Sequence, residues 1–244
     1  MTEATRREGT RTDTERDIRA KARELLVSGG QDAVTLRAIA RELGITAPAL
    51  YRYYDSREDL IGHVCHDVCA DLADELTADI ATRPDATPAE LLFAICRGFR
   101  QWARAHPREF ALVFASPPLQ TAGEAMFGST VEPFGRVFLG MAGRVLVTHE
   151  VTMPDESRVP VQMRPELLAF REAFVGNLAE QGIELPGEPL GLGAMYFMLE
   201  FWSRLYGHVA LEVFRRFPFQ VGNTEPLFES MLAGLAADIG LRTP

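Results

Sequence analysis

Residues 35–60 constrain the fold more than any other part of the chain. They read TLRAIARELGITAPALYRYYDSREDL and contain two short, apolar-patterned helices that meet at Gly44. A glycine there lets the chain turn sharply, and Ile39, Ala40 and Leu50 are spaced to form a small core between the helices. The pattern predicts a helix-turn-helix, whose second helix enters the major groove of DNA with its N-terminus.

Capping residues support these helices. Thr35 and Thr46 stand where the two short helices begin, and each can accept a hydrogen bond from a helix N–H group. Ser56 opens an S-x-x-D capping arrangement before a long amphipathic run over residues 56–81. We therefore expect that run to be one helix that links two domains.

The first residues predict a further helix and a tail. Apolar residues recur at helical spacing from Thr14 to Ser28, and Gly29 and Gly30 then end the pattern. Residues 1–13 are polar and lack periodicity, so we expect a flexible arm, either a solvated tail or a segment that enters a minor groove. The predicted DNA-binding domain covers residues 14–60.

The remainder, residues 61–244, also predicts helices. Glycines and prolines separate its apolar segments, and no segment keeps the period of two that a strand would show. The exception is a loop over residues 148–163, with a short extended piece at Thr148–Met153. The fold class is all-α, with about nine to ten helices in an N-terminal helix-turn-helix domain and a larger C-terminal helical domain.

Charge is distributed unevenly along the chain. The net charge is −9, yet residues 1–60 contain 11 Lys and Arg against 11 Asp and Glu, while the other 184 residues contain 14 against 23. Local charge governs contact with phosphates, so the acidic total does not exclude DNA as a partner. It predicts that only the N-terminal end touches DNA.

The motif in residues 35–60 closely resembles the DNA-binding domain of the TetR family of transcription regulators. The resemblance follows the pattern T-[LV]-R-x-I-A-x-x-L-G-V-x-x-x-x-L-Y-x-x-[FY]-x-x-[KR]-x-x-L, and it implies a homodimer that binds an operator. Arg57 stands where the family usually has lysine. With Leu50 facing inward, Pro48 and Arg52 point away from the core, and Arg52 is the best candidate for reading guanine. The predicted DNA contacts are Thr35, Arg37, Thr46, Ala47, Pro48, Ala49, Tyr51, Arg52, Tyr53 and Arg57.

The stretch FWSRLYGHVALEVF, residues 201–214, resembles the WHG-type C-terminal domain of the same family. This resemblance implies that residues 61–244 form a ligand-binding and dimerisation domain. Tyr206 stands where that signature has histidine. This helix is apolar over more than half its surface, so we expect it to pack on its own domain and on a symmetry mate. Together with the last helix, it supplies the predicted dimer interface: Leu205, Val209, Phe228, Met231, Leu232 and Leu235.

Aromatic and methionine residues concentrate between residues 93 and 206, where the resemblance implies a pocket for a small apolar or amphipathic effector. We interpret most of these residues as ordinary core. A polar stripe on the same helix could anchor the ligand or form intrahelical ion pairs. The residues predicted to bind ligand are Phe99, Trp102, Met198, Glu200, Trp202, Arg204 and His208.

Other functions find less support in the sequence. His63 and His66 point away from Cys65 and Cys69 on their helix, so we expect no metal site there. We find no catalytic or nucleotide-binding motif, so we expect no enzyme activity and no cofactor. A scaffold or sensor that has lost operator affinity remains an alternative. With no secretory signal and no membrane span, we expect a cytoplasmic repressor that binds a palindromic operator and is released by its ligand.

Overall fold

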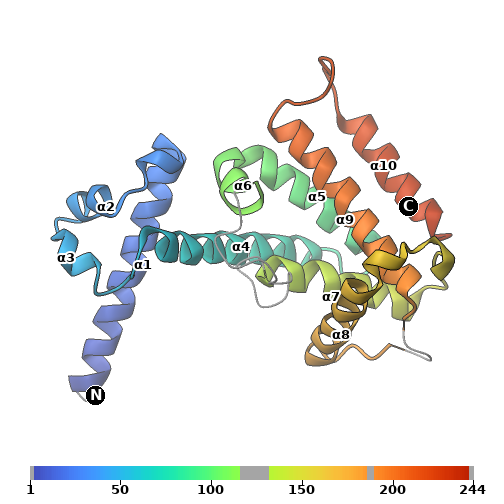
Figure 1. Cartoon of the computed structure of the whole chain (residues 1–244), viewed down its shortest axis with the longest axis horizontal. Helices are drawn as coiled ribbons and strands as arrows, with labels where there is room; N and C mark the ends of the chain where they lie inside the picture. Colours follow the sequence, from blue (N-terminus) through green and yellow to red (C-terminus); the bar gives the residue numbers. More distant parts are fainter. Residues whose placement is uncertain (1–2, 116–131, 186–189, 242–244) are drawn as a thin grey trace. The chain divides into compact units, whose positions relative to one another are not determined.

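The structure is a computed structural model that describes residues 3–115, 132–185 and 190–241 (Figure 1). Within these ranges the chain forms ten α-helices and three short 3-10 helices and no strand. The predicted all-α fold is therefore confirmed, but the extended piece at Thr148–Met153 was wrong. Thr148 ends a helix, and the residues that follow form a loop in which Thr152 donates its N–H to the Ile239 carbonyl at 3.0 Å.

The chain divides into two compact units. The N-terminal unit comprises residues 1–71 and 108–124, and the C-terminal unit comprises residues 72–107 and 125–244. The predicted boundary at residue 60 differs from this division, because the long helix contributes its first half to the N-terminal unit.

The N-terminal unit is helical throughout its described part. Its helices are α1 (Glu3–Gly29), α2 (Leu36–Glu42), α3 (Ala47–Leu50), the first part of α4 (Arg57–Ala81) and nearly all of α6 (Pro107–Phe114). Ile18, Leu26, Ile39, Leu50 and Leu60 are almost completely buried in it. Helices α1 to α4 match the helices predicted for this part of the chain. The sequence did not indicate that α6 belongs to the N-terminal unit.

Helix α1 begins at Glu3 and so includes most of the segment that the sequence predicts to be a flexible arm, residues 1–13. Proline is absent from residues 1–29, and the charged residues support the helix at i,i+4 spacing, as Arg11 and Glu15 do with an ion pair of 2.9 Å. The side chains at positions 11–13 are exposed, so the helix needs no apolar periodicity there.

The C-terminal unit contains α5 (Pro88–Ala105), α7 (Glu132–Thr148), α8 (Arg164–Glu180), α9 (Leu192–Val213) and α10 (Glu225–Asp238), together with the second part of α4. Helix α9 packs against α5, α8 and α10, and α7 packs against α5 and α8 (Figure 1). Phe93, Phe99, Phe134, Phe174 and Phe228 are fully buried in its core. No helix in the described part of the chain is long and apolar enough to span a membrane.

Candidate DNA interface and ligand cavities

Helices α2 and α3 are joined by the turn that the sequence predicts. Gly44 has φ +65°, a conformation that strains any residue with a side chain, and the Ile45 N–H group donates to the Ala40 carbonyl at 3.0 Å. Ile39 and Leu50 are completely buried between the helices. The local sequence thus fixes both the sharp turn and the small core behind it.

All three predicted capping residues act as caps. Thr35 Oγ1 accepts a hydrogen bond from the Ala38 N–H group at 3.1 Å, and Thr46 Oγ1 accepts one from the Ala49 N–H group at 3.3 Å. Ser56 Oγ accepts the Asp59 N–H group at 3.0 Å at the start of α4. These bonds begin the helices at defined residues and therefore fix which side chains face outward.

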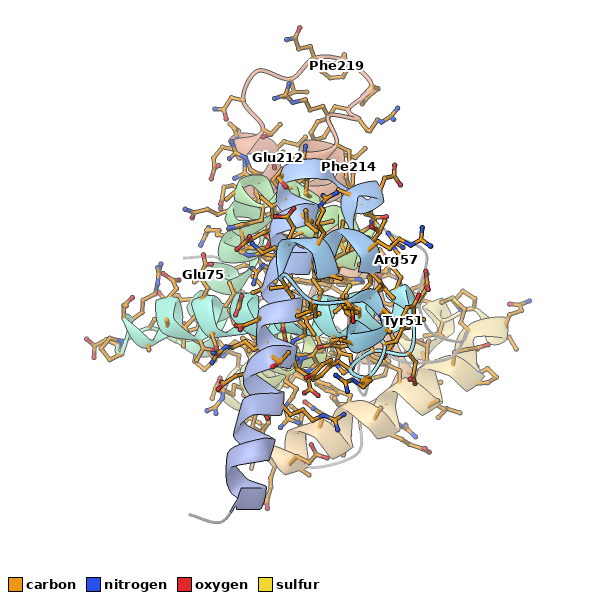
Figure 2. The ribbon with its side chains drawn as sticks, turned by 90° about the vertical axis from the view of Figure 1, so that its left-hand side faces the viewer. Tyr51, Arg57, Glu75, Glu212, Phe214 and Phe219 are labelled. Atoms are coloured by element: carbon orange, nitrogen blue, oxygen red, sulfur yellow. The ribbon has the colours of Figure 1, made fainter. Side chains whose placement is uncertain are left out.

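The structure exposes most of the residues predicted to contact DNA. Tyr51 is 54% exposed, and Figure 2 shows it beside the short helices of the N-terminal unit. Arg37 and Arg52 are exposed, and within the described residues neither forms an ion pair. Thr35, Thr46 and Pro48 are also exposed, while Ala47, Ala49 and Tyr53 are partly buried. The exposed set forms the surface that we call the reading face.

Arg57 differs from the rest of this set. Its Nε donates to the Val34 carbonyl at 2.6 Å, and its Nη2 donates to the Gln31 carbonyl at 2.8 Å. The guanidinium therefore ties the start of α4 to the segment before α2. Sequence reasoning missed this bracing role, because the partners are backbone carbonyls that no side-chain pattern reveals.

A polar brace between α1 and α4 was also missed. Arg19 donates through Nε to Asp67 and through Nη1 to the Tyr54 hydroxyl at 3.2 Å. Burial raises the pKa of Tyr54, whose hydroxyl also donates to the Glu15 carbonyl at 3.4 Å. Arg23 pairs with Asp71 and with Glu109 of α6, whose side chain is only 4% exposed. These bonds hold the helix-turn-helix on a rigid support within its own unit.

Two adjoining cavities lie in the C-terminal unit. The first, the α10 cavity, encloses about 50 Å³ and is lined from α5, α7, α9 and α10 by residues that include Phe93, Phe138, Ala142, Met198 and Leu235. The second, the α8 cavity, encloses about 330 Å³ and is lined from α7, α8 and α9 by residues that include Phe138, Glu166, Phe170, Met198 and Trp202. Phe138 and Met198 line both.

Only two of the residues predicted to bind ligand line these cavities. Met198 lines both, and Trp202 lines the α8 cavity. Phe99 and Trp102 are buried in the core, where the Phe99 ring lies 5.0 Å from that of Phe134 and the Trp102 ring 5.4 Å from that of His106. They line neither cavity.

The predicted polar anchors have other partners. Arg204 forms an exposed ion pair of 2.8 Å with Asp238 of α10, and Glu200 is partly buried. His208 is buried, and its Nε2 lies 3.8 Å from Glu212 without forming a hydrogen bond. Burial lowers the pKa of His208, so the ring is neutral at neutral pH.

A buried ion cluster around Glu212 was absent from the predicted site. Arg100 donates through Nε and Nη2 to the two carboxylate oxygens of Glu212, at 2.7 and 2.9 Å, and through Nη1 to Glu225. Burial alone would raise the pKa of Glu212, but hydrogen bonds from Arg100 and Thr224 bring it below its usual value. A signal existed in the sequence, because Arg100 lies on the apolar face of α5, where a charge requires a buried partner.

Five residues predicted for the dimer interface lie inside the protomer. Leu205, Val209, Phe228, Leu232 and Leu235 are all at most 1% exposed within the C-terminal unit, while Met231 is partly exposed. The helical pattern correctly indicated that α9 and α10 are apolar on more than one side. It did not distinguish the side that packs on the protomer from the side that remains exposed.

The cysteines lie in the core. Cys65, Cys69 and Cys96 are free and buried, and burial raises the pKa of Cys65 to about 12, so its thiol is neutral. Within the described residues, no three histidine, cysteine or acidic side chains gather into a group that could hold a metal ion.

Comparisons with known proteins agree with this geometry. Residues 18–64 match the family model of the bacterial regulatory proteins of the tetR family, and residues 92–235 match the tetracyclin repressor-like C-terminal domain. The HTH-type transcriptional regulator Rv1816 of Mycobacterium tuberculosis is 31% identical over 86% of this chain and 87% of its own. The chain belongs to the TetR family. It is accordingly a DNA-binding transcriptional regulator, as the helix-turn-helix predicts.

Other relatives of this TetR-family regulator extend the comparison. Mb1846 of Mycobacterium bovis, also an HTH-type transcriptional regulator, has the same 31% identity over 86% of this chain. The crystal structure of the regulatory protein SCO4313 is 26% identical, covers 94% of this chain and 98% of its own, and has a TM-score of 0.63. The names of these relatives agree with the prediction that this protein is a transcription regulator.

Proposed function

We propose that this protein is a repressor that binds a palindromic operator as a homodimer and leaves it when a small molecule fills the C-terminal unit. The observation that carries the proposal is the reading face, where Tyr51 and Arg52 are exposed on a helix-turn-helix braced from behind. Arg52 is placed to read a guanine and Tyr51 to contact a phosphate. Such a protein acts in the cytoplasm, where it meets DNA.

Dimerisation is supported by the exposed sides of α9 and α10. Leu199 and Leu211 on α9 and Leu227 on α10 are 38%, 38% and 48% exposed. Gly207 and Gly234 lie on the same two helices, and a Cβ added at either would meet no atom within 4 Å. Pairing these helices with their copies would bury the exposed apolar stripe in a four-helix arrangement.

Release by a ligand is supported by the chain's connectivity. Helices α4 and α6 each contribute residues to both units. A change in the C-terminal unit can therefore reach the reading face through continuous helices. In a dimer, the distance between the two reading faces must match the half-site spacing of the operator. A small change in that distance therefore lowers the affinity for the operator.

Operator binding is tested by selecting bound sequences from random duplex DNA. The proteins compared are the wild type, a Tyr51→Ala/Arg52→Ala variant, and an Arg216→Ala control that removes an exposed positive charge from the C-terminal unit. We expect the wild type and the control to enrich one palindrome and the double variant to enrich none. Failure of the wild type to enrich any sequence at low salt would contradict the proposal.

The dimer is tested with substitutions that the protomer has room for. Gly207→Arg and Gly234→Arg enter open space in the protomer, and Gly176→Arg on α8 does the same away from the proposed interface. In sedimentation equilibrium we expect the first two variants to be monomers and the Gly176 variant to remain a dimer. A dimer that survives both α9 and α10 substitutions would exclude this interface.

A further inference from the structure

We propose that the α8 cavity binds a compact, uncharged aromatic molecule and that a second copy of the chain closes the mouth of this cavity. The inference rests on the proposed function, because it names the ligand class of the C-terminal unit and requires the proposed dimer. The size and lining of the cavity indicate the ligand, and the position of its mouth indicates the partner.

Of the two cavities, only the α8 cavity has room for a ligand. It encloses about 330 Å³, whereas the α10 cavity encloses about 50 Å³. Sites for small molecules usually enclose roughly 300–1,000 Å³, and a space the size of the α10 cavity holds only a few water molecules. A ligand of the α8 cavity is therefore compact, with one or two fused rings and no long tail.

Aromatic rings form much of the wall of the α8 cavity. Phe138 of α7, Phe170 of α8 and Trp202 of α9 line it, so that three helices each supply a ring. The centroid of the Trp202 ring lies 5.8 Å from those of Phe99 and Phe134, so the packed core holds the indole in place. A flat aromatic ligand can stack on rings that are already fixed, whereas a saturated molecule of the same size gains only from leaving water.

A charge on the ligand would find no buried partner in this cavity. Its lining within the described residues contains no cation, and the nearby Arg164 and Arg171 of α8 donate to the carbonyls of Glu156 and Leu190. Glu166 also lines the cavity, but this residue is exposed, so its carboxylate remains in contact with water. An anion or a cation would lose its hydration inside the cavity without replacement, so the lining favours an uncharged molecule.

The mouth of the cavity adjoins the exposed side of α9. Among the lining residues, Gln162, Glu166 and Leu199 are exposed and therefore form its rim. Leu199 is 38% exposed although it is apolar. It shares one face of α9 with Gly207 and Leu211, which follow it at multiples of four residues. This face is the side of α9 proposed to pair in the dimer, so the mouth opens beside that interface.

A second copy that packs on this face covers Leu199 and closes the cavity. In a single protomer, a bound molecule keeps part of its surface in contact with water at the mouth. In the dimer that surface is buried as well, so the ligand binds more tightly. The effect is reciprocal, since a ligand that prefers the dimer also stabilises it. Occupancy of the cavity therefore depends on the concentration of the protein as well as on that of the ligand.

The ligand class is tested with four probes of similar shape: 2-naphthol, its saturated counterpart decahydro-2-naphthol, the anion naphthalene-2-carboxylate and the cation 2-naphthylmethylammonium. Isothermal titration calorimetry measures their binding to the full-length, DNA-free protein at neutral pH. We expect 2-naphthol to bind about tenfold more tightly than each of the others. Equal binding of the saturated probe, or tighter binding of either ion, would overturn the proposal.

Substitutions in the lining locate the bound probe. Met163→Trp fills the cavity from a partly exposed position and should weaken 2-naphthol binding about tenfold or more, and Phe170→Leu, which removes a wall ring, should weaken it severalfold. Phe217→Leu removes a ring that lines neither the α8 nor the α10 cavity, so it should leave binding unchanged. Unchanged binding in a Met163→Trp variant that keeps its helical circular dichroism would overturn the assignment of the site.

Closure by the second copy is tested with Gly234→Arg, because Gly234 lies on α10 and lines neither cavity. This variant should sediment as a monomer and bind 2-naphthol about fivefold more weakly than the wild type or less tightly still, whereas Gly176→Arg should match the wild type in both. Saturating 2-naphthol should in turn lower the dissociation constant of the wild-type dimer.

Two results would contradict closure, and they are distinguishable. A monomeric Gly234→Arg variant that binds 2-naphthol as tightly as the wild type would contradict only this inference. A wild type that sediments as a monomer would contradict the proposed dimer, and with it the closure of the mouth.

Discussion

The two units place arginine side chains in opposite surroundings. On the reading face, Arg37 and Arg52 are exposed, and neither has an ion-pair partner in the described residues. In the C-terminal unit, the Arg100 side chain is only 7% exposed, holds both oxygens of Glu212 and contacts the Phe228 ring at 4.8 Å. An arginine without an intramolecular partner is available to DNA, whereas a fully paired one serves the fold.

The largest effect should follow from removing the buried arginine. Arg100→Met leaves the Glu212 carboxylate buried without its main partner, which should lower the free energy of unfolding by about 3–5 kcal/mol. The measurement is urea unfolding followed by circular dichroism. Arg97→Met is the control, because Arg97 forms an exposed pair with Glu229 at 2.7 Å, and its loss should cost about 1 kcal/mol or less. Equal losses would show that burial does not distinguish the two pairs.

Removing an arginine from the reading face should affect DNA alone. We expect Arg52→Ala to weaken binding to the selected operator by about 1–3 kcal/mol, which is roughly 5- to 150-fold, if Arg52 reads a guanine. The free energy of unfolding should stay within about 0.5 kcal/mol of the wild type. Fluorescence anisotropy with labelled duplex measures the first quantity. A variant that binds as tightly as the wild type would remove Arg52 from the reading face.

Arg57 shares features with both kinds of arginine. It lies beside the reading face, but its guanidinium donates hydrogen bonds within the protein. Arg57→Lys keeps the charge but cannot donate to the Val34 and Gln31 carbonyls with a planar fork. We expect the free energy of unfolding to fall by about 1 kcal/mol. If lysine preserves stability and Arg57→Gln weakens only DNA binding, then Arg57 acts on phosphate and its bracing role is wrong.

The smallest effect concerns pH. The pKa of His208 is lowered in the folded protein by burial, so the unfolded chain takes up this proton more readily. Stability from His208 is therefore present above its usual pKa of about 6.5 and is lost as pH falls below it. Glu212, whose pKa is also lowered, acts in the same direction at lower pH.

Thermal unfolding between pH 8 and pH 5 measures this dependence. We expect the midpoint to fall with acidification, and the fall between pH 7 and pH 5.5 to be smaller in His208→Met than in the wild type. An identical slope in the two proteins would show that His208 does not contribute.

The features that could be predicted from the sequence are those set by interactions between residues close together in the chain. Gly44, Thr35, Thr46 and Ser56 act within a few residues of themselves, so the turn and the helix starts could be predicted from spacing alone. The exposure of Arg52 followed from the same helical geometry. The end of α3 at Leu50 did not, since the spacing of Leu50 and Tyr54 predicted a longer helix that would include Arg52.

The parts that could not be predicted depend on contacts between distant segments. Arg100 and Glu212 are 112 residues apart, and Arg23 and Glu109 are 86 apart. Aromatic residues in the C-terminal unit satisfy the same periodicity whether they line a cavity, as Trp202 does, or fill the core, as Phe99 does. The pattern of apolar residues therefore identified the helices but not the surfaces that meet.

The most direct test of operator recognition is the ratio of affinities for the selected palindrome and for a scrambled duplex of equal length and composition. Fluorescence anisotropy at physiological salt gives both constants for the wild-type protein. Base reading by a dimer predicts a ratio of about a thousand or more. A ratio near one, with equal salt dependence on both duplexes, would show that the protein binds phosphates without reading bases and would contradict the account.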